Sequence, residues 1–149
     1  MSSKENEHLH KAESSVLARL NLRVLIVEDE ALIQLMLQDT LEDMGFVVHG
    51  VCTTVEQALI AAATAGFDVA ILDVDLNEHQ ITPVSKMLCE RGIPFVFSTG
   101  SGAAGIPDGF GHYPLVEKPY SNLDLQVSLD KAMKGSWPIN LSAPEGGLT

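Results

Sequence analysis

Short apolar runs alternate with helical patterns from Leu22 to about Lys134, and this alternation constrains the fold more than any other feature of the chain. Each run has the length of a buried strand, and the segments between the runs space their apolar side chains three or four positions apart, as helices do. Strands that alternate with helices form a parallel sheet with helices on both faces. The expected strands span residues 23–27, 47–51, 69–72, 94–97 and 114–117, and the expected helices lie near residues 33–44, 55–63, 83–89 and 125–133.

Two of the expected helices carry the sequence signal of a capped N-terminus. Thr53 with Glu56, and Ser121 with Asp124, have the spacing of a capping box. In such a box a hydroxyl and a carboxylate three residues apart each bond to the other residue's backbone N–H. We therefore expect helices to begin just after Thr53 and Ser121.

The segment between the fourth and fifth strands breaks the alternation because it is rich in glycine and proline. Each glycine inside a helix costs about 1 kcal/mol and a proline costs about 3 kcal/mol. We therefore expect a weak fourth helix there, or a mobile loop in its place. The residues concerned are Gly100, Gly102, Gly105, Pro107, Gly109 and Gly111.

The length and composition indicate one globular domain with a short extension at each end. A chain of 149 residues that is 46% apolar is long enough to bury one core and too short for two ordinary domains. Residues 1–21 are mostly polar and form a predicted N-terminal extension. Residues 22–134 form the predicted domain. Residues 135–149 are rich in proline and glycine, so we expect a mostly disordered tail.

The charge and the termini exclude several classes of function. A formal net charge of −11 argues against a nucleic-acid or anionic-membrane surface, because both require a basic face. No apolar run approaches the ~20 residues that span a bilayer, and the N-terminus lacks the apolar segment of a signal peptide. A cytoplasmic location is expected. Cys52 and Cys89 lack metal-type spacing, and we expect two reduced thiols.

Polar side chains gather where the predicted strands end. In an open parallel sheet, ligands bind in the crevice beyond the carboxyl ends of the strands. The first and third strands end in carboxylates, the fourth in hydroxyls and the fifth in a lysine. In chain order these residues are Glu28, Asp29, Asp73, Asp75, Ser98, Thr99 and Lys118.

If the acidic residues converge, their repulsion must be compensated. Two unit charges ~4 Å apart interact by about 4 kcal/mol at an effective dielectric of 20. Three such pairs, made by Glu28, Asp29 and Asp73, approach the roughly 5–15 kcal/mol stability of a whole domain. Either one carboxylate protonates or a cation lies among them. Hard oxygen ligands suit Mg²⁺, and a nearby lysine and hydroxyl suit a phosphoryl group, so the pattern indicates a phosphoryl-handling site.

The order of these residues resembles the receiver domain of bacterial response regulators. The matching pattern is Glu-Asp after the first strand, Asp after the third, Ser-Thr after the fourth and Lys-Pro after the fifth. The resemblance covers Leu22 to about Lys134. It implies a flavodoxin-like fold with five parallel strands in the order 2-1-3-4-5 and helices on both faces. It also implies a signalling protein rather than an enzyme, although such a domain assists its own phosphoryl transfer and slow dephosphorylation.

The resemblance implies a role for each residue of the pattern. Asp73 is the expected phosphoacceptor. Asp29 is the expected direct Mg²⁺ ligand, and Glu28 is its mostly water-mediated companion. The backbone carbonyl of Asp75 would complete the metal site. The Asp75 side chain is expected to overhang the phosphoryl site, where it either affects dephosphorylation or simply points to solvent.

Three further residues are implied to contact the phosphoryl group itself. The Thr99 hydroxyl and the Gly100 N–H would donate hydrogen bonds to phosphoryl oxygens. Lys118 would form an ion pair with the same group. The Lys118–Pro119 bond is often cis in such domains, which X–Pro bonds tolerate.

One position departs from the usual receiver pattern. Many receivers carry an aromatic residue three positions before the lysine, and this chain carries Leu115 there. The segments FVFSTGSG and LDVDLNEHQITPV are similar to a subgroup of single-domain receivers named after a Phe-Ala-Thr-Gly motif, in which that aromatic is missing. The subgroup is associated with histidine kinases of the HWE and related types. We hypothesise that phosphorylation orders residues 100–114 instead of flipping an aromatic ring.

The expected function is therefore a stand-alone response regulator of a phosphorelay. A histidine kinase would phosphorylate Asp73 with Mg²⁺, and the product would bind an unknown protein or pass phosphate to a histidine phosphotransferase. Three alternatives stay open. Asp73 and Asp75 also fit a haloacid-dehalogenase-like phosphatase, Glu28 with the same pair is similar to a Toprim metal site, and a receiver-like interaction module would take no phosphate.

Overall fold

The computed structural model describes residues 20–64, 66–76 and 80–135. The predicted extension at residues 1–21, apart from its last two residues, and the predicted tail at 135–149, apart from Gly135, lie outside the described residues. The described part forms a five-stranded parallel sheet with the order β2-β1-β3-β4-β5. The predicted fold class, a flavodoxin-like sheet, is therefore confirmed. Its strands are β1 (Arg23–Val27), β2 (Val47–Cys52), β3 (Val69–Asp73), β4 (Phe95–Thr99) and β5 (Leu115–Glu117).

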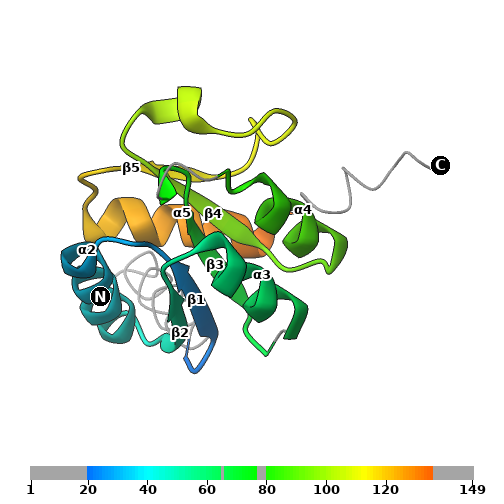
Figure 1. Ribbon diagram of the computed structural model, residues 1–149. Coiled ribbons are helices and arrows are strands. Elements are labelled where there is room, and N and C mark those ends of the chain that lie inside the picture. The colour runs from blue at the N-terminus through cyan, green and yellow to red at the C-terminus, as the bar shows by residue number, and fades with distance from the viewer. Residues whose placement is uncertain (1–19, 65, 77–79, 136–149) are drawn as a thin grey trace, which may run out of the picture.

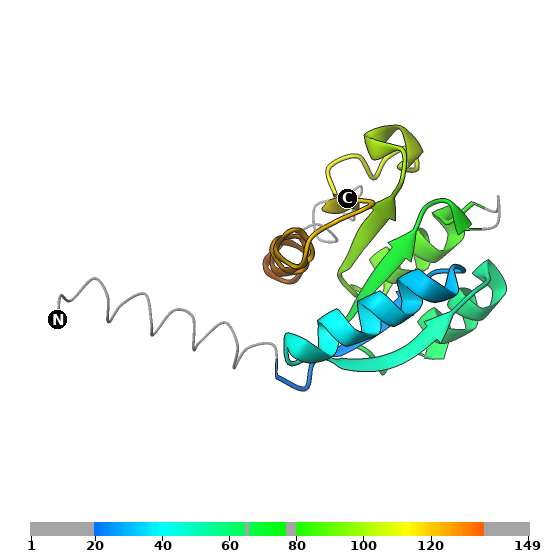
Figure 2. The same cartoon turned by 90° about the vertical axis from the view of Figure 1, so that its left-hand side faces the viewer.

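Helices cover both faces of the sheet, as Figures 1 and 2 show. The apolar stripes of the helices divide the core in two. Leu37 and Leu129 belong to the core on one face, and Ala58 and Leu88 belong to the core on the other. All residues of β3 and β4 are buried, as expected of central strands with helices on both sides. The α-helices of the described part are α2 (Ala31–Asp43), α3 (Val55–Thr64), α4 (Thr82–Glu90) and α5 (Asn122–Lys134).

One of the two predicted helix caps is confirmed and the other is shifted by one residue. Ser121 and Asp124 form the full capping box of α5. The prediction of Thr53 and Glu56 was wrong: the Gln57 N–H donates to Thr54 Oγ1 at 3.1 Å, and the Thr53 N–H donates to Gln57 Oε1 at 2.8 Å. The shift occurs because α3 begins at Val55, which is buried, so the third helical position falls on Gln57.

The glycine-rich segment contains only one 3₁₀ turn, η2 (Gly102–Gly105), as expected from its composition. This segment extends beyond the sheet at the top of Figure 1 and returns to β5. Its second half is anchored, because Phe110 and Tyr113 are buried. The Tyr113 ring stacks on Phe95 with 4.6 Å between ring centroids. The hypothesised ordering of residues 100–114 on phosphorylation stays a prediction, and the anchored second half leaves only the first half, near η2, to become ordered.

None of the helices in the described ranges is long and apolar enough to cross a membrane.

Cys52 and Cys89 are free thiols, as the sequence predicts.

Candidate functional site

The carboxyl ends of four neighbouring strands bring the predicted site residues to one edge of the sheet. Glu28 follows β1, Asp73 ends β3, Thr99 ends β4 and Lys118 follows β5. The Glu28, Asp73 and Thr99 side chains are polar, yet these residues are only 1%, 2% and 0% exposed. Burying a polar group costs free energy unless hydrogen bonds or opposite charges compensate it. The contacts of each of these residues therefore show what the site can do.

The three acidic residues predicted to hold a metal lie together. Glu28, Asp29 and Asp73 can each offer a carboxylate oxygen so that the three oxygens lie within 4.8 Å of one another. Asp29 is half-buried and the other two are buried. The set consists of hard oxygen donors, which is what Mg²⁺ prefers, and it leaves room in an octahedron for water and phosphate oxygens. The residues present therefore fit the metal that the sequence predicts.

Lys118 partly compensates this acidic cluster. Its Nζ atom lies 2.9 Å from Glu28 Oε1 and 3.4 Å from Asp73 Oδ1. Burial raises the pKa of Glu28 to about 7, against the hydrogen bond from Lys118, and the charge of Asp73 adds to the increase. Burial alone would lower the pKa of Lys118, but the Glu28 hydrogen bond and the Asp73 charge outweigh it and raise that pKa. One ammonium group thus pairs with two of the three carboxylates, those of Glu28 and Asp73.

Asp73 is held in a fixed orientation. Its Oδ1 atom accepts a hydrogen bond from the Asp75 N–H at 2.9 Å and pairs with Lys118. Both of these contacts use the same oxygen, so within the described part of the chain Oδ2 is the oxygen left for another partner. Because the contacts of Oδ1 fix the carboxylate, Oδ2 is positioned for nucleophilic attack on phosphorus.

Thr99 and Gly100, the predicted phosphoryl ligands, are bonded to other groups in this structure. The Thr99 hydroxyl donates to the Gly102 carbonyl at 3.2 Å and accepts from the Ser101 N–H at 2.9 Å. The Gly100 N–H donates to Asp75 Oδ2 at 3.2 Å. Both donors would have to change partners to contact a phosphoryl group on Asp73.

Two further residues shape the site, and neither is indicated as a site residue by the sequence alone. A Cβ atom on Gly105 would lie 3.0 Å from Val74 Cγ2 and 3.3 Å from Thr99 Oγ1, so this glycine packs η2 onto the threonine. Tyr120 is close enough to Glu28 and Lys118 to feel their charges, and burial raises the pKa of its hydroxyl to about 12. The glycine-rich composition indicates that glycines matter in this segment, but only the folded structure shows that Gly105 is the one next to Thr99.

Two smaller expectations have different outcomes. The Lys118–Pro119 peptide bond is cis, as the resemblance implied. The proposed role of the Asp75 carbonyl as a metal ligand stays a prediction.

Leu115, at the position where many receivers have an aromatic residue, is partly buried and packs against the core on the α3 and α4 side.

Comparisons with known proteins agree with this geometry. The family model described as "Response regulator receiver domain" matches residues 24–109, more than half of the chain. SdrG from Sphingomonas melonis Fr1 is 38% identical, the match covers 76% of this chain and 94% of that protein, and the TM-score is 0.65. A BeF3-activated conformation of SdrG from Pseudomonas melonis Fr1 gives 38% identity, coverages of 74% and 95%, and a TM-score of 0.65.

The receiver domain of PhyR from Erythrobacter litoralis is 25% identical, with coverages of 78% of this chain and 93% of that one and a TM-score of 0.63. No curated protein sequence matches the chain. The fold, the acidic cluster beside a lysine, and the match over residues 24–109 all lead to one conclusion: the chain belongs to the response regulator receiver domain family.

Proposed function

We propose that this chain acts as a response regulator that accepts a phosphoryl group on Asp73 from a histidine kinase, with Mg²⁺ bound by Glu28, Asp29 and Asp73. The observation that carries the proposal is the position of Lys118, whose ammonium group bridges Glu28 and the candidate phosphoacceptor Asp73. Receiver domains are signalling domains rather than classical enzymes, and they work with histidine kinases and downstream effectors.

The chemistry of the transfer follows from the residues at the site. Oδ2 of Asp73 forms a bond to the phosphorus of a phosphohistidine, while the bond from phosphorus to the imidazole nitrogen of the kinase breaks. The electron pair of that bond stays on the imidazole. Lys118 neutralises charge on the phosphoryl oxygens, and the fixed carboxylate supplies the positioning on which phosphoryl transfer depends. Bound Mg²⁺ would supply further positive charge for the same oxygens.

The product would carry about −1.5 to −2 additional charge at an edge that is already acidic. In the proposed signal, Thr99 then exchanges the Gly102 carbonyl for a phosphoryl oxygen, and η2 becomes ordered in a new position. A partner would read this change at the β4–β5 segment. The partner is either a downstream protein or a histidine phosphotransferase.

The proposal includes membership of the Phe-Ala-Thr-Gly subgroup and phosphorylation by an HWE-type kinase. It is supported by the sequence Phe-Ser-Thr-Gly at residues 97–100 and by Leu115 in place of an aromatic residue. Phosphotransfer from purified, autophosphorylated kinases of the HWE type and of another histidine kinase type tests this finer assignment. Faster transfer from the HWE-type kinase is expected, and equal rates would contradict it.

Incubation with Mg²⁺ and acetyl phosphate tests the main proposal. We expect a mass increase of one phosphoryl group in the wild type and in the Asp108→Asn control, and none in Asp73→Asn or without Mg²⁺. A phosphorylated Asp73→Asn variant would refute the assignment of the acceptor. Rapid release of phosphate from simple phosphate monoesters would instead support the phosphatase alternative, and no reaction with either compound would support the interaction module.

A further inference from the structure

The Asp75 carboxylate connects the ends of the two strands that carry the proposed phosphoacceptor and the proposed phosphoryl ligands. Its own backbone N–H donates to Asp73 Oδ1 at 2.9 Å, and its Oδ2 accepts from the Gly100 N–H at 3.2 Å. The residue is therefore bonded to the acceptor at the end of β3 and to the first residue after β4. In this structure the Gly100 N–H already has an anionic oxygen as its partner.

We propose that Asp75 is a positioning residue that competes with the phosphoryl group for the Gly100 N–H and so opposes phosphorylation of Asp73. The inference rests on the proposed function, since it assumes that Asp73 takes the phosphoryl group. A backbone N–H has one hydrogen and makes one strong hydrogen bond. A phosphoryl oxygen can thus bind Gly100 only after the Asp75 carboxylate has left.

Charge also favours the replacement of Asp75 by a phosphoryl oxygen at the Gly100 N–H. An aspartyl phosphate adds about −1.5 to −2 charge two residues from Asp75. Like charges at this distance repel, and the phosphoryl group offers the Gly100 N–H a charged acceptor in place of the carboxylate. Phosphorylation therefore supplies both a competing acceptor and a repulsion that moves Asp75 away.

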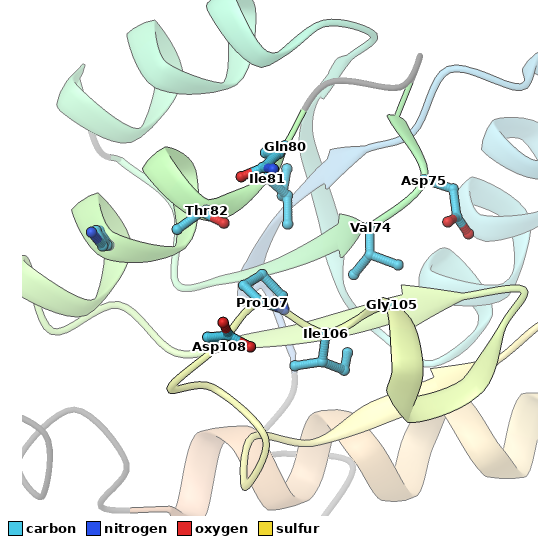
Figure 3. Close-up of a pocket in the computed structure, with 10 residues that line it drawn as sticks. Val74, Asp75, Gln80, Ile81, Thr82, Gly105, Ile106, Pro107 and Asp108 are labelled. Atoms are coloured by element: carbon cyan, nitrogen blue, oxygen red, sulfur yellow. The ribbon is translucent and has the colours of Figure 1, made fainter.

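The structure offers space for the displaced carboxylate. Asp75 is exposed and lies at one side of a cavity of about 730 Å³. Figure 3 shows this cavity between Val74, the start of α4 and the segment from Gly105 to Asp108. Lys86 and Asp108 also line it, so besides Asp75 the cavity carries one charged group of each sign. Asp75 can therefore leave Gly100 without entering the core.

The loss of the bond between Asp75 and Gly100 also affects the position of η2. Gly100 is followed by Ser101 and Gly102, the two residues that hold the Thr99 hydroxyl. As long as Asp75 holds the Gly100 N–H, the start of this segment is fixed to the end of β3. Release of Asp75 frees the backbone that must move for Thr99 to change its partner, so one carboxylate restrains both phosphoryl ligands.

Beryllofluoride, used as a stable mimic of the phosphoryl group, tests the proposal on the full chain. With Mg²⁺ present, it is titrated into the wild type, Asp75→Asn and Asp75→Ala, and binding is followed by backbone amide resonances. Asn keeps an oxygen acceptor without the charge, and Ala removes both. Loss of a hydrogen bond of ordinary strength predicts about threefold to tenfold tighter binding in Asp75→Ala, with Asp75→Asn between it and the wild type. Asp39→Ala, which removes an exposed carboxylate on α2 outside this cavity, should bind like the wild type.

Hydrogen exchange of the Gly100 amide follows the hydrogen bond itself, and Asp75→Asn is the comparison that loses the charge but keeps an oxygen acceptor. Without beryllofluoride this amide should be protected in the wild type and exchange faster in Asp75→Ala. With beryllofluoride the two proteins should show equal protection. Unchanged exchange in Asp75→Ala, or equal gains in affinity for the Asn and Ala variants, would overturn the competition.

The wild type also separates this inference from the function on which it rests. If acetyl phosphate modifies Asp73 normally while the Asp75 variants behave like the wild type, only the role of Asp75 is refuted. If the wild type takes neither the phosphoryl group nor beryllofluoride, the proposed function and this inference fail together.

Discussion

The ammonium group of Lys118 lies 2.9 Å from Oε1 of Glu28, so a residue after β5 is paired with a residue after β1. These two strands are separated in the sheet by β3 and β4. The lysine therefore reaches across the end of the sheet and passes the end of β3, where it also contacts Asp73 at 3.4 Å. This one side chain holds together the acidic edge from which the proposed function follows.

The raised pKa of Glu28 predicts that the metal-free protein loses stability as the pH rises. The folded state holds the Glu28 proton up to a pKa of about 7, whereas the unfolded chain releases it near 4.5. Between these values the folded state binds more protons, so the free energy of unfolding falls with increasing pH. Urea unfolding in EDTA at about pH 5 and about pH 7.5 measures this fall. A Glu28→Gln variant should show a smaller fall, and an equal fall would contradict the assignment to Glu28.

Magnesium should stabilise the folded protein through the acidic cluster. A ligand that binds only the folded state at 100 times its Kd adds about 2.7 kcal/mol to the free energy of unfolding. We expect Mg²⁺ to raise the melting temperature of the wild type, and Asp29→Asn to weaken Mg²⁺ binding by about tenfold or more because it removes a charged ligand. Calorimetric titration checks the affinity. Asp39→Asn, an exposed position on α2, is the control and should bind Mg²⁺ like the wild type.

Two glycines of the same segment should respond differently to alanine. In Gly105→Ala the new Cβ would meet Val74 Cγ2 at 3.0 Å and Thr99 Oγ1 at 3.3 Å. Such overpacking costs about 1–3 kcal/mol and should displace η2 from Thr99. A Cβ on Gly111 meets nothing within 4 Å, so Gly111→Ala should change the free energy of unfolding by less than about 0.5 kcal/mol. Chemical denaturation of the two variants measures the difference, and similar values would show that η2 is not packed on Thr99.

The aromatic cluster under the β4–β5 segment should contribute to global stability. Phe110 is 6% exposed and lies near Phe95, Phe97 and Tyr113, with centroid distances of 6.2, 6.2 and 5.4 Å. Phe110→Ala should therefore lower the free energy of unfolding by about 3–5 kcal/mol. Leu123→Ala, at a position that is 66% exposed, is expected to cost less than about 0.5 kcal/mol.

Denaturant unfolding of both variants decides whether the second half of the segment is part of the core. A small loss of stability in Phe110→Ala would mean that this half is not anchored. In that case the whole of residues 100–114, and not only the part near η2, could become ordered on phosphorylation.

The sequence by itself determined the alternation of strands and helices and the residues that end each strand, because these depend on local hydrophobic periodicity. It also determined that Glu28, Asp29, Asp73, Thr99 and Lys118 gather at one edge, since the carboxyl ends of parallel strands must share that edge. The capping box at Ser121 and the weak fourth helix likewise depend only on neighbouring residues.

Only the tertiary structure decided the contacts between residues far apart in the chain. The bond between Asp75 and the Gly100 N–H, the packing of Gly105 on Thr99, and the stacking of Tyr113 on Phe95 all depend on how the β4–β5 segment closes over the sheet. A glycine-rich segment has no periodic pattern from which this path can be predicted, because glycine allows many backbone conformations at similar free energy. Burial of a few aromatic side chains selects the path, and that selection exists only in the folded protein.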